Sequence, residues 1–259
     1  MCSSDLTRQR YFIAFAWCLA FLSPQHAAAQ TFPVKPLRMV IPYPPGGATD
    51  LMGRMLGAKL GTQLGQAVVI DNRGGATGMI GTRNVAQSPP DGYSILFTVG
   101  TDMALAKAMS KDNPVDPLTE LTPVIAAVAS VSCIAASGAA PVNTLGELIA
   151  YAKANPGKLT YGTPGVGSSP HLNGEKLRLL GVNLLHVPFK GSGPSVAALV
   201  AGQIDIMIGN LATAQSQSRT GKVKVLAMTH GKRYEGLPEI PSIVESLPGG
   251  DMPQGWYGF

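Results

Sequence analysis

Short apolar runs alternate with helix-length segments through the first half of the chain. Between two of these runs, Met52, Leu56, Leu60 and Leu64 recur at the spacing of one helix face, which predicts an amphipathic helix. Prolines and a glycine in residues 88–92 mark a turn after a second helical segment. The expected strands are 37–43, 67–72 and 93–100, and the expected second helix is 79–86.

The same alternation resumes in the second half of the chain. Strands that alternate with helices imply βαβ units and parallel sheets. The sequence therefore predicts an α/β fold in which helices flank mostly parallel sheets. The expected helices of this half are 144–155, 169–180 and 194–201, and its expected strands are 159–163, 184–189, 204–210 and 223–228.

The apolar stretch 121–136 contains no turn signal and separates the two series. We expect it to be a strand that crosses from one α/β domain to the next. Residues 255–259 are typical of the start of a strand that crosses back, after a connection rich in proline and glycine. The predicted organisation is 30–130 for domain 1, 131–252 for domain 2 and 253–259 for the start of the return crossover, whose remainder is expected to be missing.

The first 29 residues have the pattern of a cleaved secretory signal peptide. Arg8 and Arg10 precede the apolar run 11–22, and an Ala-x-Ala pattern places the expected cleavage after Ala29. The run is too short to span a bilayer of about 30 Å. The sequence therefore predicts a secreted protein.

Composition is that of a globular protein, with 45% hydrophobic and 14% charged residues. Arg8, Arg10 and Asp5 lie in the expected signal peptide, so the formal net charge of +5 falls to +4 without it. The basic residues are scattered, whereas nucleic-acid binding needs a basic stripe and stacking platforms. Cys133 is alone after residue 29 and lies in an apolar run, so we expect a small buried side chain without a disulfide.

Glycine-rich loops follow several of the expected strands in both halves of the chain. In an open parallel sheet, ligands bind beyond the carboxyl ends of the strands, where helix N-termini converge. Glycine lets the backbone approach a ligand, and the free N–H groups of a first helical turn attract anions. Thr49 or Asp50 can cap the first of these helices. The loops are 44–48, 72–78, 100–102, 162–169 and 190–193.

Motifs for catalysis are mostly missing from the sequence. It contains no G-x-x-x-x-G-K-[ST] loop, no G-x-G-x-x-G after a strand and no G-x-S-x-G elbow. Ser168 or Ser169 with His171 could supply a nucleophile and a base, but no third orienting group is identified and Ser169 is equally a natural helix N-cap. With four histidines, one of them inside 1–29, and no paired ligand spacing, no metal site is predicted.

Several motifs, in this order, resemble the substrate-binding proteins of tripartite tricarboxylate transporters, the Bug or TctC family. The resemblance implies a two-domain type II periplasmic-binding-protein fold that closes on a small organic carboxylate without a cofactor. It also implies delivery to membrane subunits by a monomeric receptor. The motifs are YPPGGATD, DNRGGATGMIG, PPDGYSILFT, TYGTPGVGSSPHLNGEKL, HVPFKGSGPSVAALVAGQID and LPEIPSIVES with the closing WYGF.

The resemblance also implies which residues hold the ligand, through backbone N–H groups and small hydroxyls instead of an arginine fork. Arg54 is expected to be a solvated surface charge. The implied ligand-binding residues are Tyr43, Gly46, Gly47, Thr49 and Thr101 in the first domain and Thr163, Ser168, Ser169, His171 and Lys190 in the second.

Three departures from the family pattern accompany the resemblance. Gly209 stands where members commonly carry an aspartate, so a ligand ammonium would lose a partner there. Asp102 stands where histidine or asparagine is frequent, and an acid near the mouth of the site disfavours a second carboxylate on the ligand. The family also continues past the last residue. Two other functions stay open: a periplasmic hydrolase using His171, and a sensor receptor that presents its closed form to a kinase.

Overall fold

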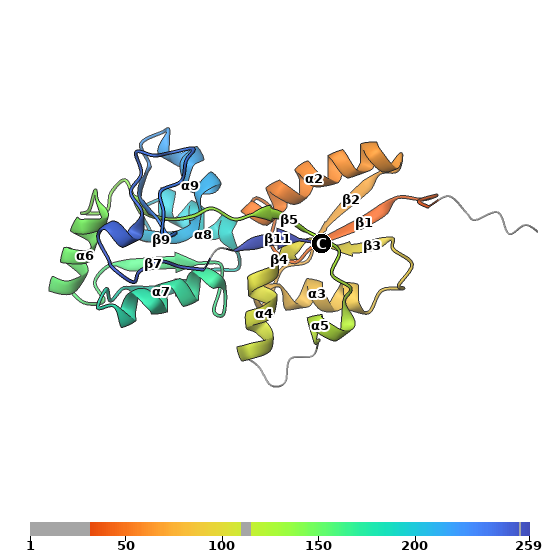
Figure 1. Cartoon of the computed structure of the whole chain (residues 1–259), viewed down its shortest axis with the longest axis horizontal. Helices are drawn as coiled ribbons and strands as arrows, with labels where there is room; N and C mark the ends of the chain where they lie inside the picture. Colours follow the sequence, from red (N-terminus) through yellow and green to blue (C-terminus); the bar gives the residue numbers. More distant parts are fainter. Residues whose placement is uncertain (1–31, 110–114, 254) are drawn as a thin grey trace, which may run out of the picture. The chain divides into compact units, whose positions relative to one another are not determined.

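Three parallel strands in the order β2-β1-β3 form the first sheet of the computed structural model, which describes residues 32–109, 115–253 and 255–259 (Figure 1). The predicted signal peptide lies outside these residues. The strands are β1 (Leu37–Ile41), β2 (Val68–Asn72) and β3 (Ser94–Leu96). The helix α2 (Ala48–Leu64) packs on β1 and β2, and α3 (Met79–Ala86) packs on β1 and β3.

The predicted amphipathic helix is confirmed as α2, and its contact with the sheet depends on glycine as well as on the apolar stripe. Met52, Leu56 and Leu60 pack against the core of this sheet. A Cβ on Gly53 would lie only 2.5 Å from Cδ1 of Ile41, so glycine lets the helix approach the strand closely. The helix ends at Leu64, and the C-cap residue Gly65 has the left-handed backbone that favours glycine at this position.

The predicted strand 93–100 is wrong in its extent. The segment divides into β3 and β4 (Thr98–Val99), which belong to different sheets, and the helix α4 (Gly100–Met109) follows at once. Phe97 separates the two strands and is fully buried. Its ring packs near those of Tyr257 and Phe259. Contacts with residues far along the chain therefore end the first strand. Short helical turns η1 (Ala76–Gly78) and α5 (Pro117–Glu120) complete this region.

Five strands in the order β10-β6-β9-β7-β8 form the largest sheet. It is mixed, and not mostly parallel as predicted, because β6 runs antiparallel to both of its neighbours while β7 is parallel to β8 and β9. Parallel pairing normally accompanies a helical crossover, and no single helix joins β6 to either neighbour. The strands are β6 (Ser132–Ser137), β7 (Thr160–Thr163), β8 (Leu185–Pro188), β9 (Ile206–Asn210) and β10 (Val223–Met228).

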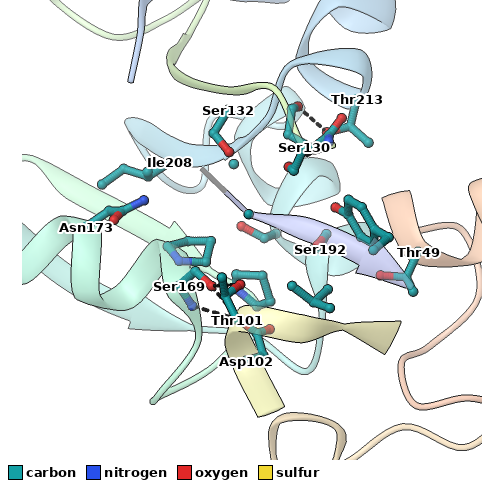
Figure 2. Close-up of a pocket in the computed structure, with 18 of the residues that line it drawn as sticks. Thr49, Thr101, Asp102, Ser130, Ser132, Ser169, Asn173, Ser192, Ile208 and Thr213 are labelled. Atoms are coloured by element: carbon teal, nitrogen blue, oxygen red, sulfur yellow. Dashed lines mark hydrogen bonds between the residues drawn. The ribbon is translucent and has the colours of Figure 1, made fainter. Parts of the chain in front are cut away.

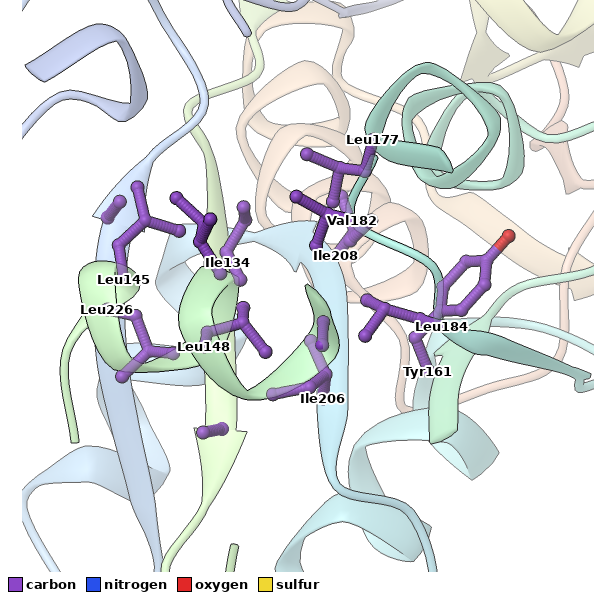
Figure 3. Packing of buried hydrophobic residues seen from close by; sticks show 14 of the residues in the cluster. Ile134, Leu145, Leu148, Tyr161, Leu177, Val182, Leu184, Ile206, Ile208 and Leu226 are labelled. Atoms are coloured by element: carbon purple, nitrogen blue, oxygen red, sulfur yellow. The ribbon is translucent and has the colours of Figure 1, made fainter. Parts of the chain in front are cut away.

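Helices cover both faces of this sheet. On one face, Leu145 and Leu148 of α6 (Leu145–Ala154) pack against Ile134, Ile206 and Leu226 of the strands (Figure 3). On the other face the helices are α8 (Ser192–Val200) and α9 (Leu211–Ser218), whose apolar side chains share a core with buried Cys133. Cys133 is free and buried, as expected, and burial raises the pKa of its thiol to about 12. The helix α7 (Ser169–Leu179) packs on β7 and β9.

The third sheet joins distant parts of the chain through antiparallel pairs in the order β4-β11-β5. The predicted single strand 121–136 is two strands, β5 (Ala126–Ala129) in this sheet and β6 in the large one, with Ser130 and Val131 between them. The predicted closing strand is confirmed as β11 (Trp256–Gly258). The domain boundaries expected near residues 130 and 252 stay predictions. Among the described helices, none is both long and apolar enough to cross a membrane.

Candidate functional site

A cavity of about 60 Å³ lies where the first turns of α2, α4, α7 and α8 meet the end of β9 (Figure 2). A cavity of about 15 Å³ is enough for one water, so this one has room for several waters or a small ligand. The described residues that line it are Tyr43, Thr49, Val99, Thr101, Asp102, Ser130, Ser132, Pro164, Ser169, Pro170, Asn173, Ser192, Ser195, Met207, Ile208, Gly209, Asn210, Thr213, Pro253, Gly255 and Tyr257.

A second hollow of about 260 Å³ adjoins this cavity through the shared residues Ser130 and Ser132. Its wall includes residues 230 and 232–235, all of which are exposed. The smaller cavity is the better candidate site because buried polar groups surround it.

The N-terminal turns of α2 and α8 face each other at the cavity. A Cβ built on Gly47 would lie 3.4 Å from the backbone nitrogen of Gly193 and 3.6 Å from Cβ of Ser192. Both helices are preceded by a glycine N-cap and neither has a side-chain cap. Thr49 and Ser192 line the cavity from these two turns. Uncapped N–H groups and the positive ends of two helix dipoles make this side suited to an anion.

Asp50 fixes the loop before α2 without lining the cavity. Its Oδ2 accepts a hydrogen bond of 2.9 Å from Gly46 N, and its Oδ1 accepts one of 3.0 Å from Asn72 Nδ2. Burial raises the pKa of Asp50, but the hydrogen bonds from Arg54, Gly46 and Asn72 outweigh burial and lower it. Arg54 forms an ion pair of 3.1 Å with Asp50 on the half-exposed side of the helix, so it directs no charge into the cavity.

The carboxylate of Asp102 links the start of α4 to the start of α7. Oδ1 accepts hydrogen bonds of 2.9 Å from the backbone N–H of Ser169 and 2.6 Å from its hydroxyl. Oδ2 accepts one of 2.9 Å from the Tyr43 hydroxyl, and the hydroxyls of Thr101 and Ser169 share a bond of 2.7 Å. In Figure 2, Thr101, Asp102 and Ser169 lie together at one side of the cavity.

Burial has the largest effect on the pKa of Asp102. It raises the pKa of Asp102, although the bonds from Ser169 and Tyr43 oppose that rise. Burial and the neighbouring Asp102 also raise the pKa of Tyr43 well above its ordinary value, so Tyr43 stays a neutral donor.

Ser195 supplies an unused polar group to the cavity. It lies in α8, is 1% exposed, and its Oγ has no hydrogen-bond partner among the described residues. Buried hydroxyls are nearly always paired, and an unpaired one costs about 1–3 kcal/mol. Ser195 is one of the residues that line the cavity.

The opposite side of the cavity was not anticipated from the sequence. Asn210 Nδ2 donates to Ser130 Oγ over 3.3 Å, and both side chains face the Tyr257 hydroxyl. Burial raises the pKa of Tyr257 to about 12. Asn210 ends a strand and caps α9, a position at which ligand contacts are common in parallel sheets. That signal was available in the sequence, whereas the approach of Tyr257 from the end of the chain was not.

The predicted site residues divide into those that line the cavity and those that do not. Tyr43, Thr49, Thr101 and Ser169 line it. Gly46 and Gly47 form the turn that leads into α2, and the positive φ of 84° at Gly46 favours glycine.

The other four lie outside the lining. Thr163 shares a 2.7 Å hydrogen bond with Nε2 of His186, and Lys190 is exposed. Ser168 caps α7, and His171 stacks on His186 with ring centroids 4.4 Å apart.

The serine and histidine side chains at the start of α7 do not form a nucleophile and base pair. The Ser168 hydroxyl donates to the carbonyl of Gly165 over 2.7 Å, and Nδ1 of His171 accepts from Gly167 N over 3.2 Å. The Ser169 hydroxyl is bonded to Asp102. Within the described residues no group of three His, Cys, Asp or Glu side chains could hold a metal ion.

Fold and cavity together define the class of protein. Sheets flanked by helices and a small polar cavity at helix N-termini are features of a two-domain solute-binding protein of the periplasmic type. The chain belongs to the TctC family, described as the tripartite tricarboxylate transporter family receptor, which matches residues 52–259.

Individual relatives agree with this assignment. The protein BugT of Bordetella pertussis is 34% identical over 220 residues, which are 84% of this chain and 68% of the relative. The solved structure of the periplasmic binding protein BugD is 37% identical, with a TM-score of 0.82 over 88% of this chain and 76% of BugD. MatC from Rhodopseudomonas palustris, solved with bound malate, is 31% identical, with a TM-score of 0.79 over 88% of this chain and 78% of MatC.

Proposed function

We propose that this protein is a periplasmic receptor that captures a small organic carboxylate between its two domains and delivers it to the membrane component of a tripartite transporter. The observation that carries the proposal is a cavity at two uncapped helix N-termini, lined in part by Ser195, whose buried hydroxyl is unpaired among the described residues. The malate bound to the relative MatC supports a carboxylate as the ligand class.

The ligand carboxylate is held at the α2 and α8 side of the cavity. There it accepts hydrogen bonds from backbone N–H groups of the two first turns and from the hydroxyls of Thr49, Ser192 and Ser195. Helix N-termini bind carboxylates in this way without a basic side chain. Tyr43, Thr101 and Ser169 line the cavity beside Asp102. Four predicted residues lie outside the cavity lining, and their loops give the site its shape without direct contact between these side chains and the ligand. They are Thr163, Ser168, His171 and Lys190.

The domains that close on the ligand are 30–130 and 131–252, with the return crossover beginning at 253. Ser130 and Ser132 sit at the first crossing and line the cavity, so a rotation there opens or closes the site. Export through the predicted signal peptide, cleaved after Ala29, brings the receptor to the periplasm.

The test of ligand class is calorimetric titration with mono-, di- and tricarboxylates, alongside melting curves, because binding to the native state alone raises the melting temperature. Thr49→Val should weaken binding about tenfold, the effect of losing one hydrogen bond to a charged group. Thr62→Val, on the exposed side of the same helix, is the matched control and should leave binding unchanged. Equal affinity in both variants would remove the α2 turn from the site.

Two other functions would give different results. A hydrolase would show no response to any carboxylate, together with ester turnover that His171→Ala abolishes. A sensor receptor would bind the same ligand but would be retained by a kinase ectodomain and not by transporter membrane subunits in a pull-down with the ligand present.

A further inference from the structure

Asp102 is the single charged side chain among the described residues that line the cavity. The others are apolar residues, glycines, prolines, hydroxyl-bearing residues and two asparagines. Asp102 is only 4% exposed, so water screens its charge poorly. Any ligand in this cavity therefore lies within a few ångströms of a carboxyl group that has no cationic side chain beside it in the described lining.

The hydrogen bonds of Asp102 leave room for one more donor. A carboxylate has about four lone-pair positions. Ser169 N and Oγ occupy two of them at Oδ1, and the Tyr43 hydroxyl occupies one at Oδ2. Tyr43 stays protonated, because burial raises its pKa well above the ordinary value. In the ionised form of Asp102, the remaining position at Oδ2 can accept a hydrogen bond from a ligand but cannot donate one to a second ligand carboxylate.

The cavity thus has two chemically different ends. The turns of α2 and α8 offer hydrogen-bond donors and lie beside the unpaired Ser195 hydroxyl, which suits one carboxylate. The Asp102 end repels another. In a cavity of about 60 Å³, the two ends of a short dicarboxylate cannot both avoid Asp102. Repulsion between two carboxylates a few ångströms apart in a partly desolvated site is large enough to weaken binding more than tenfold.

We propose that Asp102 is a specificity-determining residue that restricts this site to monocarboxylates whose far end donates a hydrogen bond to Oδ2, and that it excludes dicarboxylates of the same length. Amide, hydroxyl and ammonium groups share this donor chemistry. The inference rests on the proposed function, because it assumes that a ligand carboxylate occupies the α2 and α8 end.

The experiment compares succinate with its half-amide, succinamate, which has the same chain length and replaces one carboxylate by a donor. Calorimetric titration of the unmodified protein at neutral pH should show succinamate bound at least tenfold more tightly than succinate. Asp102→Asn should reduce that ratio at least tenfold, because the amide keeps an acceptor for Ser169 while removing the charge. Asp71→Asn removes the same charge at an ion pair outside the cavity lining and should keep the ratio.

Each outcome counts for or against the inference. Equal binding of succinate and succinamate by the unmodified protein overturns it, and this comparison requires no variant to fold. A preference for succinamate that Asp102→Asn leaves intact, with a cooperative unfolding curve, assigns the selection to other residues and also overturns it. Failure of both compounds and of a wider series of monocarboxylates to bind rejects the proposed function itself, and the inference with it.

Discussion

Replacing Ser195 by alanine should make the empty protein more stable while weakening its binding of ligand. The Ser195 hydroxyl is buried at 1% exposure and has no hydrogen-bond partner among the described residues. An unsatisfied buried hydroxyl costs about 1–3 kcal/mol. The position lies inside α8, where alanine is also favoured over serine by roughly 0.5 kcal/mol. The two effects have the same sign.

The expected gain in the free energy of unfolding is about 1–2 kcal/mol for Ser195→Ala, towards the low end of the summed effects because the cavity admits water. For a chain of this length that corresponds to a rise in melting temperature of roughly 2–6 °C. The expected loss in ligand affinity is about tenfold, because a hydrogen bond to a charged group contributes about 1.5–3 kcal/mol.

Chemical denaturation and calorimetry, each with and without a carboxylate ligand, measure both effects. Ser168→Ala is the matched control, since that hydroxyl is equally buried but donates to Gly165 O over 2.7 Å and caps α7. It should destabilise the protein by about 1 kcal/mol. A Ser195→Ala protein that is destabilised as much as Ser168→Ala, or that binds ligand as tightly as before, would refute the reasoning that Ser195 is kept unpaired for a ligand.

Three further predictions concern packing and ionisation. Gly81→Ala should lower the free energy of unfolding by about 1–3 kcal/mol in denaturation curves, because a Cβ there would lie 2.8 Å from Cα of Pro42. The hydrogen bond from Arg233 is the main reason that the pKa of Glu245 is lowered from 4.5 to about 2. The ionised form of Glu245 therefore stabilises the fold above pH 4.5, and this contribution disappears as the pH falls towards 2. The Glu245→Gln variant should be less stable than the unmodified protein at neutral pH and equally stable near pH 2. Burial raises the pKa of Asp102 from 3.8, so the folded state holds this proton more tightly than the unfolded state, and stability falls as the pH rises from 3.8 through the folded pKa. The difference in the free energy of unfolding between Asp102→Asn and the unmodified protein should therefore grow over that pH window. A difference that stays constant would contradict the raised pKa.

Much of the fold follows from local sequence pattern. The helical stripe of α2 and most of the alternation of strands and helices in the second half were predicted correctly, because an amphipathic face and a buried strand each have their own period. The helix α9 between β9 and β10 was not predicted. The turn at Gly46 could also be located, since backbone conformation depends on a few adjacent residues. The predicted N-caps were wrong by one to three residues, because Ser168 and not Ser169 caps α7, and Gly47 precedes α2 without a side-chain cap. Sequence pattern also indicated the α2 and α7 turns as binding loops, although which residues touch ligand stays a prediction.

The arrangement of the strands and the chemistry of the cavity were decided by tertiary structure. The division of 121–136 into β5 and β6, and of 93–100 into β3 and β4, depends on pairing with β11 and with distant strands, which no local period encodes. The same holds for the cavity, where Asp102 contacts Ser169 across 67 positions of sequence and the Ser195 hydroxyl has no hydrogen-bond partner in the described part of the chain. The burial, hydrogen-bond partners and ionisation of a side chain are set only when separate segments of the chain pack together. The sequence therefore determined the helices and loops that surround the site, while the tertiary structure decided which of their polar groups are left for a ligand.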